Sequence, residues 1–213
     1  MRKLCIIFCI ILFSYNLIYA GEPKEIISSY SDKVIKLFNS IDTAKPRKEW
    51  EEELRTKLID LAHEVIDFNI MARMALGPNW RKLDMDQQEK FVDLFVDMLE
   101  NTYFDNIVDN MDEIKDYTSD NIRILEEVKL SDIKAEVKTH IIYDNKKIPV
   151  NYRMVKIGNE WKCYDAYIEG IGLVQNYRSQ FRDLLNRMTT KELLAYLEEK
   201  VRKGEGLKEI EVE

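Results

Sequence analysis

Few residues of this 213-residue sequence have the types and spacing that enzymes use for chemistry. The best acid–base candidates are Tyr164 and Asp165, because a phenol and a carboxyl group in an apolar pocket can exchange protons with a substrate. They are adjacent in a segment with the alternating pattern of a β-strand, and neighbouring strand residues point to opposite faces of a sheet. At most one of the two side chains can therefore face a shared cavity.

The histidines and the glycines give no catalytic pattern either. His140 falls on the polar side of a strand pattern, and His63 lies among charged residues of a helical segment, so neither is placed beside a nucleophile. The sequence contains no phosphate-binding glycine loop, no nucleophile elbow and no metal-ligand spacing. We therefore predict no catalytic residue, no metal site and no cofactor.

The first twenty residues have the pattern of a secretory signal peptide. Arg2 and Lys3 precede an uncharged apolar run over residues 4–13, and Ala20 offers a cleavage site before Gly21. The apolar run is too short to cross a bilayer, which takes roughly twenty residues. We expect residues 1–20 to be cleaved and the rest to be exported to the periplasm; an N-terminal membrane anchor is the alternative.

Residues 21–213 have the length of a single domain. Loss of Arg2 and Lys3 takes the formal net charge from −7 to −9, and such a charge repels nucleic acid. Cys163 is then the one remaining cysteine, which excludes an internal disulfide and a cysteine metal cluster. We predict a monomeric domain that is held together by its apolar core and binds no nucleic acid.

The first half of this domain has the periodicity of helices. Apolar residues recur at helical spacing from Ile26 to Ile41, and Pro46 opens a second helix. A short helix over 68–76 ends at Gly77-Pro78, a strong pair of helix breakers. Asp84 then caps a long helix, with Gln87 in capping-box spacing.

The second half changes to the alternation of strands. Apolar and polar residues alternate over 133–143 and again over 148–154, with Asp144-Asn145 as the turn between them. Gly158-Asn159 is a second turn, and strands over 122–128 and 161–168 complete a four-stranded antiparallel meander. Helices over 173–188 and from Thr189 or Thr190 to about 202 follow. The predicted fold class is α+β, a bent sheet covered by N- and C-terminal helices.

Two segments carry a family resemblance. The first is DFNIMARMALGPNWR over 67–81, followed by Gln87-Gln88 and Phe91. The second is WKCYDAYIEGIGLVQNYRSQF over 161–181. Together they resemble the MlaC family, also called toluene-tolerance auxiliary proteins, which are the periplasmic lipid-binding components of the Mla phospholipid transport system. The resemblance covers essentially all of residues 21–213.

The resemblance implies a fold related to the NTF2-like cone, with a deep apolar pocket for the acyl chains of a phospholipid. It also implies a carrier that shuttles lipid between an outer-membrane lipoprotein complex and an inner-membrane ABC transporter with a lipid-binding subunit, which maintains outer-membrane lipid asymmetry. The family commonly has a serine where this chain has Gly172. That departure puts in doubt any polar contact of the missing hydroxyl.

From the faces of the expected elements we predict ten lipid-binding residues, for which ordinary core packing is the alternative. They are Met74, Phe95, Leu99, Tyr103, Tyr152, Met154, Leu173, Val174, Tyr177 and Phe181.

Three arginines are predicted to serve the lipid headgroup or docking. Arg73 and Arg81 offer bidentate donors to a phosphate, or alternatively pair with Asp67 or Asp165. Arg178 is expected at the pocket mouth or on a docking face. Two other functions stay open beside the carrier: a small-molecule enzyme on an NTF2-like cone, and a periplasmic adaptor that binds protein and no lipid.

Overall fold

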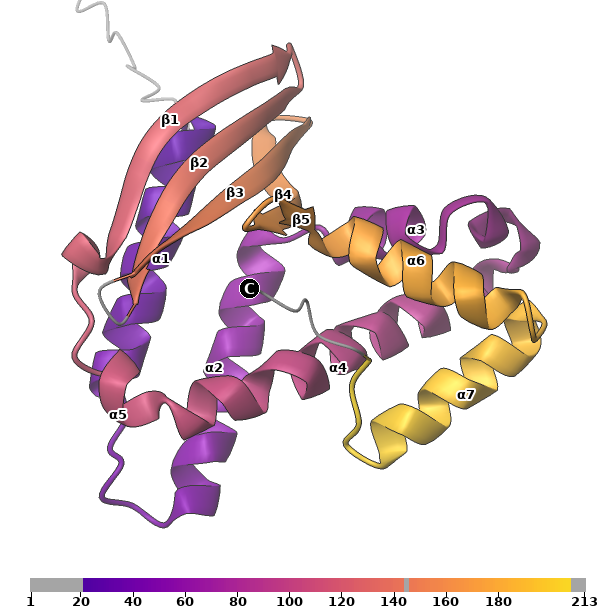
Figure 1. Ribbon diagram of the computed structural model, residues 1–213, viewed down its shortest axis with the longest axis horizontal. Helices are drawn as coiled ribbons and strands as arrows, with labels where there is room; N and C mark the ends of the chain where they lie inside the picture. The colour runs from indigo at the N-terminus through magenta and orange to yellow at the C-terminus, as the bar shows by residue number, and fades with distance from the viewer. Residues whose placement is uncertain (1–20, 144–145, 208–213) are drawn as a thin grey trace, which may run out of the picture.

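The computed structural model describes residues 21–143 and 146–207 (Figure 1). Their order is helices, sheet, helices, which confirms the predicted α+β class. The helices are α1 (Pro23–Ser40), α2 (Arg47–Val65), α3 (Phe68–Leu76), α4 (Met85–Asp109), α5 (Met111–Ile114), α6 (Leu173–Leu185) and α7 (Thr190–Arg202), with 3-10 turns η1 (Gly77–Lys82) and η2 (Ser119–Asn121). The strands are β1 (Ile122–Ser131), β2 (Lys134–Tyr143), β3 (Lys146–Ile157), β4 (Glu160–Ile168) and β5 (Ile171–Gly172).

The sheet is an antiparallel meander in the order β1-β2-β3-β4-β5. The four predicted strands are present, and the Gly158 turn has the left-handed backbone that a tight hairpin needs. The predicted turn at Asp144-Asn145 lies outside the described residues. Register shifts in the β1–β2 and β3–β4 pairs mark bulges, which bend strands.

The short fifth strand was not predicted. Glu169 and Gly170 both have positive φ, 50° and 87°, and they turn the chain tightly enough for Gly172 to pair with Tyr167. A glutamate is uncommon in this backbone region, so Gly170 is the one residue of this turn whose type indicates a positive φ. The extra strand places the start of α6 directly beside the end of β4.

Helix ends follow the local signals that the sequence predicts. Asp84 and Gln87 form the expected capping box, with N–H···O distances of 2.9 and 3.1 Å. Asp67 caps α3 by accepting from the Ile70 N–H at 2.8 Å. Helix α6 ends three residues before the predicted 188, because Thr189 is extended as the N-cap of α7 and bonds Glu192. None of the described helices combines the length and the apolar character needed to span a membrane.

The helices form two groups, one around each half of the long α4 (Figure 1). Helices α1 and α2 pack on each other, and α1 also packs on β1 and β2. Helices α3, α6 and α7 gather around the first half of α4, beyond the β4–β5 edge of the sheet. The second half of α4, followed by α5, lies beneath the end of the strands that is away from the β1–β2 turn. This arrangement gives the sheet different neighbours at its two ends.

Candidate functional site

The apolar core is divided into three clusters rather than one. A helical cluster joins α3, the first half of α4, α6 and α7, and contains the stacked and edge-on rings of Phe91, Phe95, Tyr177 and Phe181. An α2 cluster joins α1, α2, α5 and the second half of α4 around Leu54. A sheet cluster joins α1 to β2, β3 and β4. The helical and sheet clusters meet at Ile66, which packs against both, and the α2 cluster lies beside the second half of α4.

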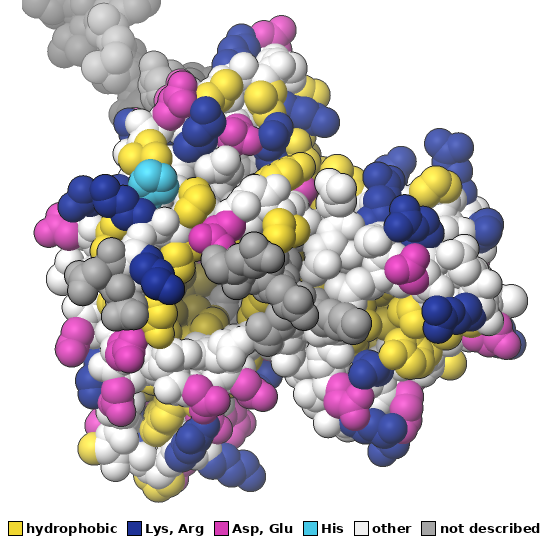
Figure 2. Space-filling model, viewed as in Figure 1, with side chains coloured by type: hydrophobic (Ala, Val, Ile, Leu, Met, Phe, Trp, Pro, Cys, Tyr) yellow, Lys and Arg dark blue, Asp and Glu magenta, His cyan; other side chains and the backbone are white. Residues whose placement is uncertain are grey.

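The apolar face of the sheet is buried to different extents at its two ends. At the β1–β2 turn end, Val137 and Met154 are fully buried in the sheet cluster. At the other end, Ile141 is paired with Ile148 on the same face, yet both are only half-buried and belong to none of the three clusters. In Figure 2 the surface between this end of the sheet and the α4–α5 row is hollowed, with hydrophobic side chains inside. This hollow is the candidate site.

A hydrogen bond joins the sheet to the α4–α5 row at one end of the hollow. The Tyr143 hydroxyl at the end of β2 donates to Asn110 Oδ1 at the α4–α5 junction, over 3.2 Å. Nearby, burial raises the pKa of Tyr117, and the adjacent Tyr143 raises it further. The Tyr117 phenol therefore stays neutral at neutral pH, which suits a site for hydrocarbon better than a charged group would.

The ten predicted lipid-binding residues do not all lie at this hollow. Phe95, Tyr177 and Phe181 are fully buried among helices, and Met154 is fully buried against α1. Leu99 and Leu173 are half-buried against the helical cluster, Tyr152 is half-buried against the sheet cluster, and Tyr103 on α4 is half-buried. Met74 and Val174 line a different pocket beside α6.

Sequence reasoning did not select the residues at the uncovered end of the sheet. Ile141, Tyr143, Ile148 and Ile168 continue the apolar alternation of their strands, and all four are half-buried. That alternation was the available signal. It placed them on the apolar face but could not indicate that they would be only half-buried there.

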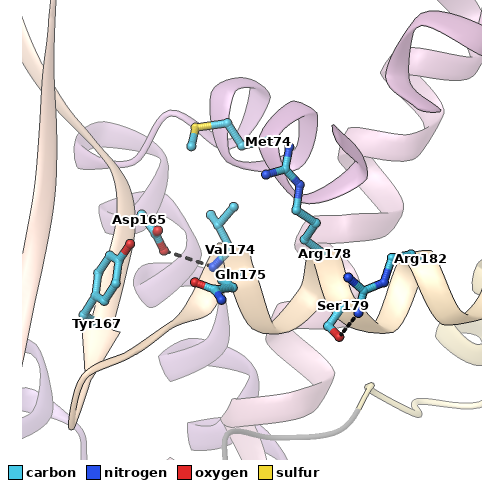
Figure 3. A pocket seen from close by; sticks show the side chains of 8 residues that line it. All are labelled: Met74, Asp165, Tyr167, Val174, Gln175, Arg178, Ser179 and Arg182. Carbon is cyan, nitrogen blue, oxygen red and sulfur yellow. Dashed lines mark hydrogen bonds between the residues drawn. The ribbon is translucent and has the colours of Figure 1, made fainter. Parts of the chain in front are cut away.

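The second pocket lies between β4, α3 and α6 and has a volume of about 340 Å³ (Figure 3). It is lined by Met74, Asp165, Tyr167, Val174, Gln175, Arg178, Ser179 and Arg182.

Asp165 explains how the chain tolerates Gly172. Its Oδ1 accepts from the N–H of Val174 at 3.0 Å and of Ala166 at 2.9 Å, so it caps the first turn of α6. A Cβ at Gly172 would lie 3.1 Å from the ring of Tyr167, which is closer than ordinary contacts. Burial raises the pKa of Asp165, opposed by its two backbone hydrogen bonds and by Arg153. The missing serine hydroxyl is thus not needed to cap this helix.

The three predicted arginines are exposed and carry no ion pair with any described carboxylate. The alternative pairing of Arg73 and Arg81 with Asp67 or Asp165 is not formed, because those two carboxylates accept backbone N–H groups instead. Of the three, Arg178 lines the pocket beside α6.

The candidate acid–base groups do not form a reactive set. The Asp165 carboxylate accepts hydrogen bonds from backbone N–H groups. Burial raises the pKa of the Cys163 thiol, two residues earlier on the strand, to about 12, so that thiol is not a nucleophile at neutral pH. His63 packs edge-on against Phe68, with ring centroids 5.0 Å apart. Within residues 21–143 and 146–207, no group of three or more His, Cys, Asp or Glu side chains is arranged to hold a metal.

A sequence model of the MlaC protein family matches residues 29–199. The chain belongs to the MlaC family. Members of this family are the periplasmic, non-enzymatic phospholipid carriers of the Mla system.

Comparison of structures gives the same fold. The phospholipid-binding protein from Ralstonia solanacearum, solved in complex with a phospholipid, superposes with a TM-score of 0.72 at 20% identity. The match covers 86% of this MlaC chain and 99% of the Ralstonia chain. The comparison with curated proteins found no match.

Proposed function

We propose that this MlaC protein carries a phospholipid, with its acyl chains in the hollow between the uncovered end of the sheet and the α4–α5 row. The observation that carries the proposal is the hollow at this end of the apolar sheet face, where the apolar residues Ile141 and Ile148 are only half-buried (Figure 2). The Ralstonia protein, which has the same fold, holds a phospholipid.

The energetics of such a cargo favour handover by direct contact. Burying a methylene is worth roughly 0.8 kcal/mol, so two chains of about sixteen carbons gain on the order of 25 kcal/mol over water. This exceeds the roughly 18–21 kcal/mol at which non-covalent affinity saturates, and the excess is lost to chain ordering and imperfect fit. Release into water is then very slow, so the cargo has to pass to a partner that accepts the chains directly.

The partners in this proposal are those of the Mla system: an outer-membrane lipoprotein complex and an inner-membrane ABC transporter with a lipid-binding subunit. A signal peptide over residues 1–20, which lie outside the described residues, would deliver residues 21–213 to the periplasm as a single monomeric domain. Movement of phospholipid between the two complexes would maintain outer-membrane lipid asymmetry.

The proposed lining combines the residues at the open end of the sheet with part of the predicted set. Ile141, Tyr143, Ile148 and Ile168 form the sheet wall, and the half-buried Leu99, Tyr103 and Tyr152 have surface that a lipid can reach. The fully buried members of the predicted set would contact lipid only if the side chains around them move.

Native mass spectrometry of the chain, expressed with its own signal and purified without detergent, tests the proposal. A mass increment equal to one phospholipid, confirmed by lipid extraction, is the expected result. A protein free of lipid that binds none from vesicles would refute the carrier function. Turnover of a small molecule would favour an enzyme, and an inert protein would favour an adaptor.

A further inference from the structure

The pocket beside α6 opens on the opposite side of the sheet from the hollow. Tyr167 is one of its walls, and the Arg153 guanidinium lies 5.1 Å from the Tyr167 ring. Arg153 in turn pairs with Glu136 at 2.6 Å, on the polar face of β2 that alternates with Ala135 and Val137. The pocket is therefore separate from the proposed lipid site.

Arg178 is the least satisfied charge in this pocket. It is exposed, and within the described residues its guanidinium has no hydrogen bond and no ion pair. Figure 3 shows it extending from α6 toward α3. A Cβ at Gly77 would lie 2.9 Å from both Nε and Nη2 of Arg178, so the absence of a side chain there lets the guanidinium rest against the end of α3. The guanidinium of Arg178 therefore rests against the end of α3, and no described carboxylate neutralises its charge.

Arg182, one helical turn further along α6, adds a second positive charge. Its Nη2 donates to Ser179 Oγ at 3.0 Å, and its Nε lies 3.7 Å from Asp183, a distance too long for a strong ion pair. Asp165 at the other end of the pocket is engaged by two backbone N–H groups. At this end of the pocket, the positive charge of Arg178 is therefore not balanced by any described carboxylate, in a chain whose formal net charge is −7.

The pocket also has an apolar part beside its polar residues Gln175 and Ser179. Met74 from α3 and Val174 from α6 face the pocket beside the Tyr167 ring (Figure 3). A volume of about 340 Å³ suits one or two protein side chains. The combination of an apolar floor and an arginine rim is typical of a contact in which an apolar anchor is flanked by an acidic side chain.

We infer that this pocket is a docking site for an acidic segment of a partner protein, whose carboxylate pairs with Arg178 and Arg182 and whose neighbouring apolar side chain enters between Met74 and Val174. The guanidinium fork matches a carboxylate bidentately. A flat bilayer surface does not fill a concave pocket, whereas a protein side chain does. The inference rests on the proposed carrier function for the existence of docking partners, but not on the contents of the hollow.

The test uses two short capped peptides, one with a leucine followed by two glutamates and one with glutamines in their place, titrated into the ¹⁵N-labelled full chain. We expect the glutamate peptide to shift the amide signals of Gln175 and Ser179. We expect it to bind about tenfold more tightly than the glutamine peptide, a factor that corresponds to one charge-assisted contact of about 1.4 kcal/mol.

Variants locate the contact. Arg178→Gln should weaken the glutamate peptide about tenfold, since it loses one charge-assisted contact, and Arg178→Lys should recover only part of the loss, because lysine keeps the charge without the fork. Arg123→Gln is the matched control: Arg123 is exposed, has no ion pair with a described residue and lies on β1 at the opposite edge of the sheet. It should leave binding unchanged. Equal melting temperatures show that each variant is folded.

Three outcomes would overturn the inference. The first is equal affinity of the glutamate peptide for wild type and Arg178→Gln. The second is equally tight binding of free glutarate, which would make this a small-anion site. The third is Arg178-dependent binding to vesicles of phosphatidylcholine and phosphatidylglycerol without peptide binding, which would make it a membrane contact. Phospholipid content is measured on the same samples. Wild-type protein without phospholipid would refute the carrier function but not the docking site. If wild-type protein contains phospholipid, the peptide result decides the docking site.

Discussion

The two ends of the sheet have the same alternation and different surroundings. Val137 and Met154 are fully buried because the N-terminal half of α1 packs on them. Ile141 and Ile148 lie on the same face of the same two strands, yet they are only half-buried beside the hollow. The comparison teaches that an apolar face specifies only that something apolar must cover it. At one end the cover is a helix, and at the other we propose that it is the cargo.

The largest effect on stability is expected at the packed end. Met154→Ala removes a fully buried side chain from the sheet cluster and should lower the free energy of unfolding by about 2–5 kcal/mol. Urea denaturation of delipidated protein measures this. Lipid bound per folded molecule should not change. A loss below about 1 kcal/mol would mean that the packed end is as loose as the open one.

At the open end, a bulkier side chain in the hollow should reduce the amount of bound phospholipid and leave the stability of the protein nearly unchanged. Ile148→Trp adds bulk to the hollow, so co-purified phospholipid should fall several-fold while the free energy of unfolding changes by less than about 1 kcal/mol. Quantitative lipid extraction is the measurement. Ile157→Trp, on the exposed far end of the same strand, is the control and should retain full lipid content. Equal lipid in both variants would contradict the proposed position of the cargo.

A smaller effect is expected from the contact that ties the open end to α5. Tyr143→Phe removes the hydrogen bond to Asn110 and should cost about 0.5–1.5 kcal/mol of unfolding free energy. Hydrogen exchange at the end of β2 should become faster. Tyr196→Phe on α7, whose hydroxyl bonds no described residue, serves as control. No change in exchange in Tyr143→Phe would show that this contact does not hold the end of the sheet.

The smallest effect concerns the pH dependence of stability that arises from the buried carboxyl group of Asp165 on β4. Because burial raises the native pKa of Asp165 above its unfolded value near 3.8, protonation favours the folded state. Its stabilising contribution is full below the unfolded pKa and is lost as pH rises through the folded pKa. In Asp165→Asn, the free energy of unfolding should not fall in this way as the pH rises. Urea denaturation at several pH values, from below the unfolded pKa to above the folded pKa, measures the difference. A stability difference between the two proteins that is independent of pH would show that the native pKa is not raised.

Short-range signals determined much of the fold. The Asp84–Gln87 capping box, the Thr189 cap and the α3 limits at Phe68 and Leu76 were all predictable, because each depends on residues within a few positions of one another. The family resemblance rested on the same kind of information and was confirmed over residues 29–199. The alternation of β2 and β3 was equally readable, because strand side chains repeat every two residues.

The tertiary structure decided what those elements face. Met74 and Val174 lie on apolar faces, but their contacts depend on how α3 and α6 meet the β4–β5 edge, so they line an arginine-rimmed pocket rather than the hollow. The capping of α6 by Asp165 likewise depends on the unpredicted strand β5. The sequence by itself determined which faces are apolar, because that depends on local periodicity. Only the packing of distant segments decided which of those faces is covered by protein and which is left open.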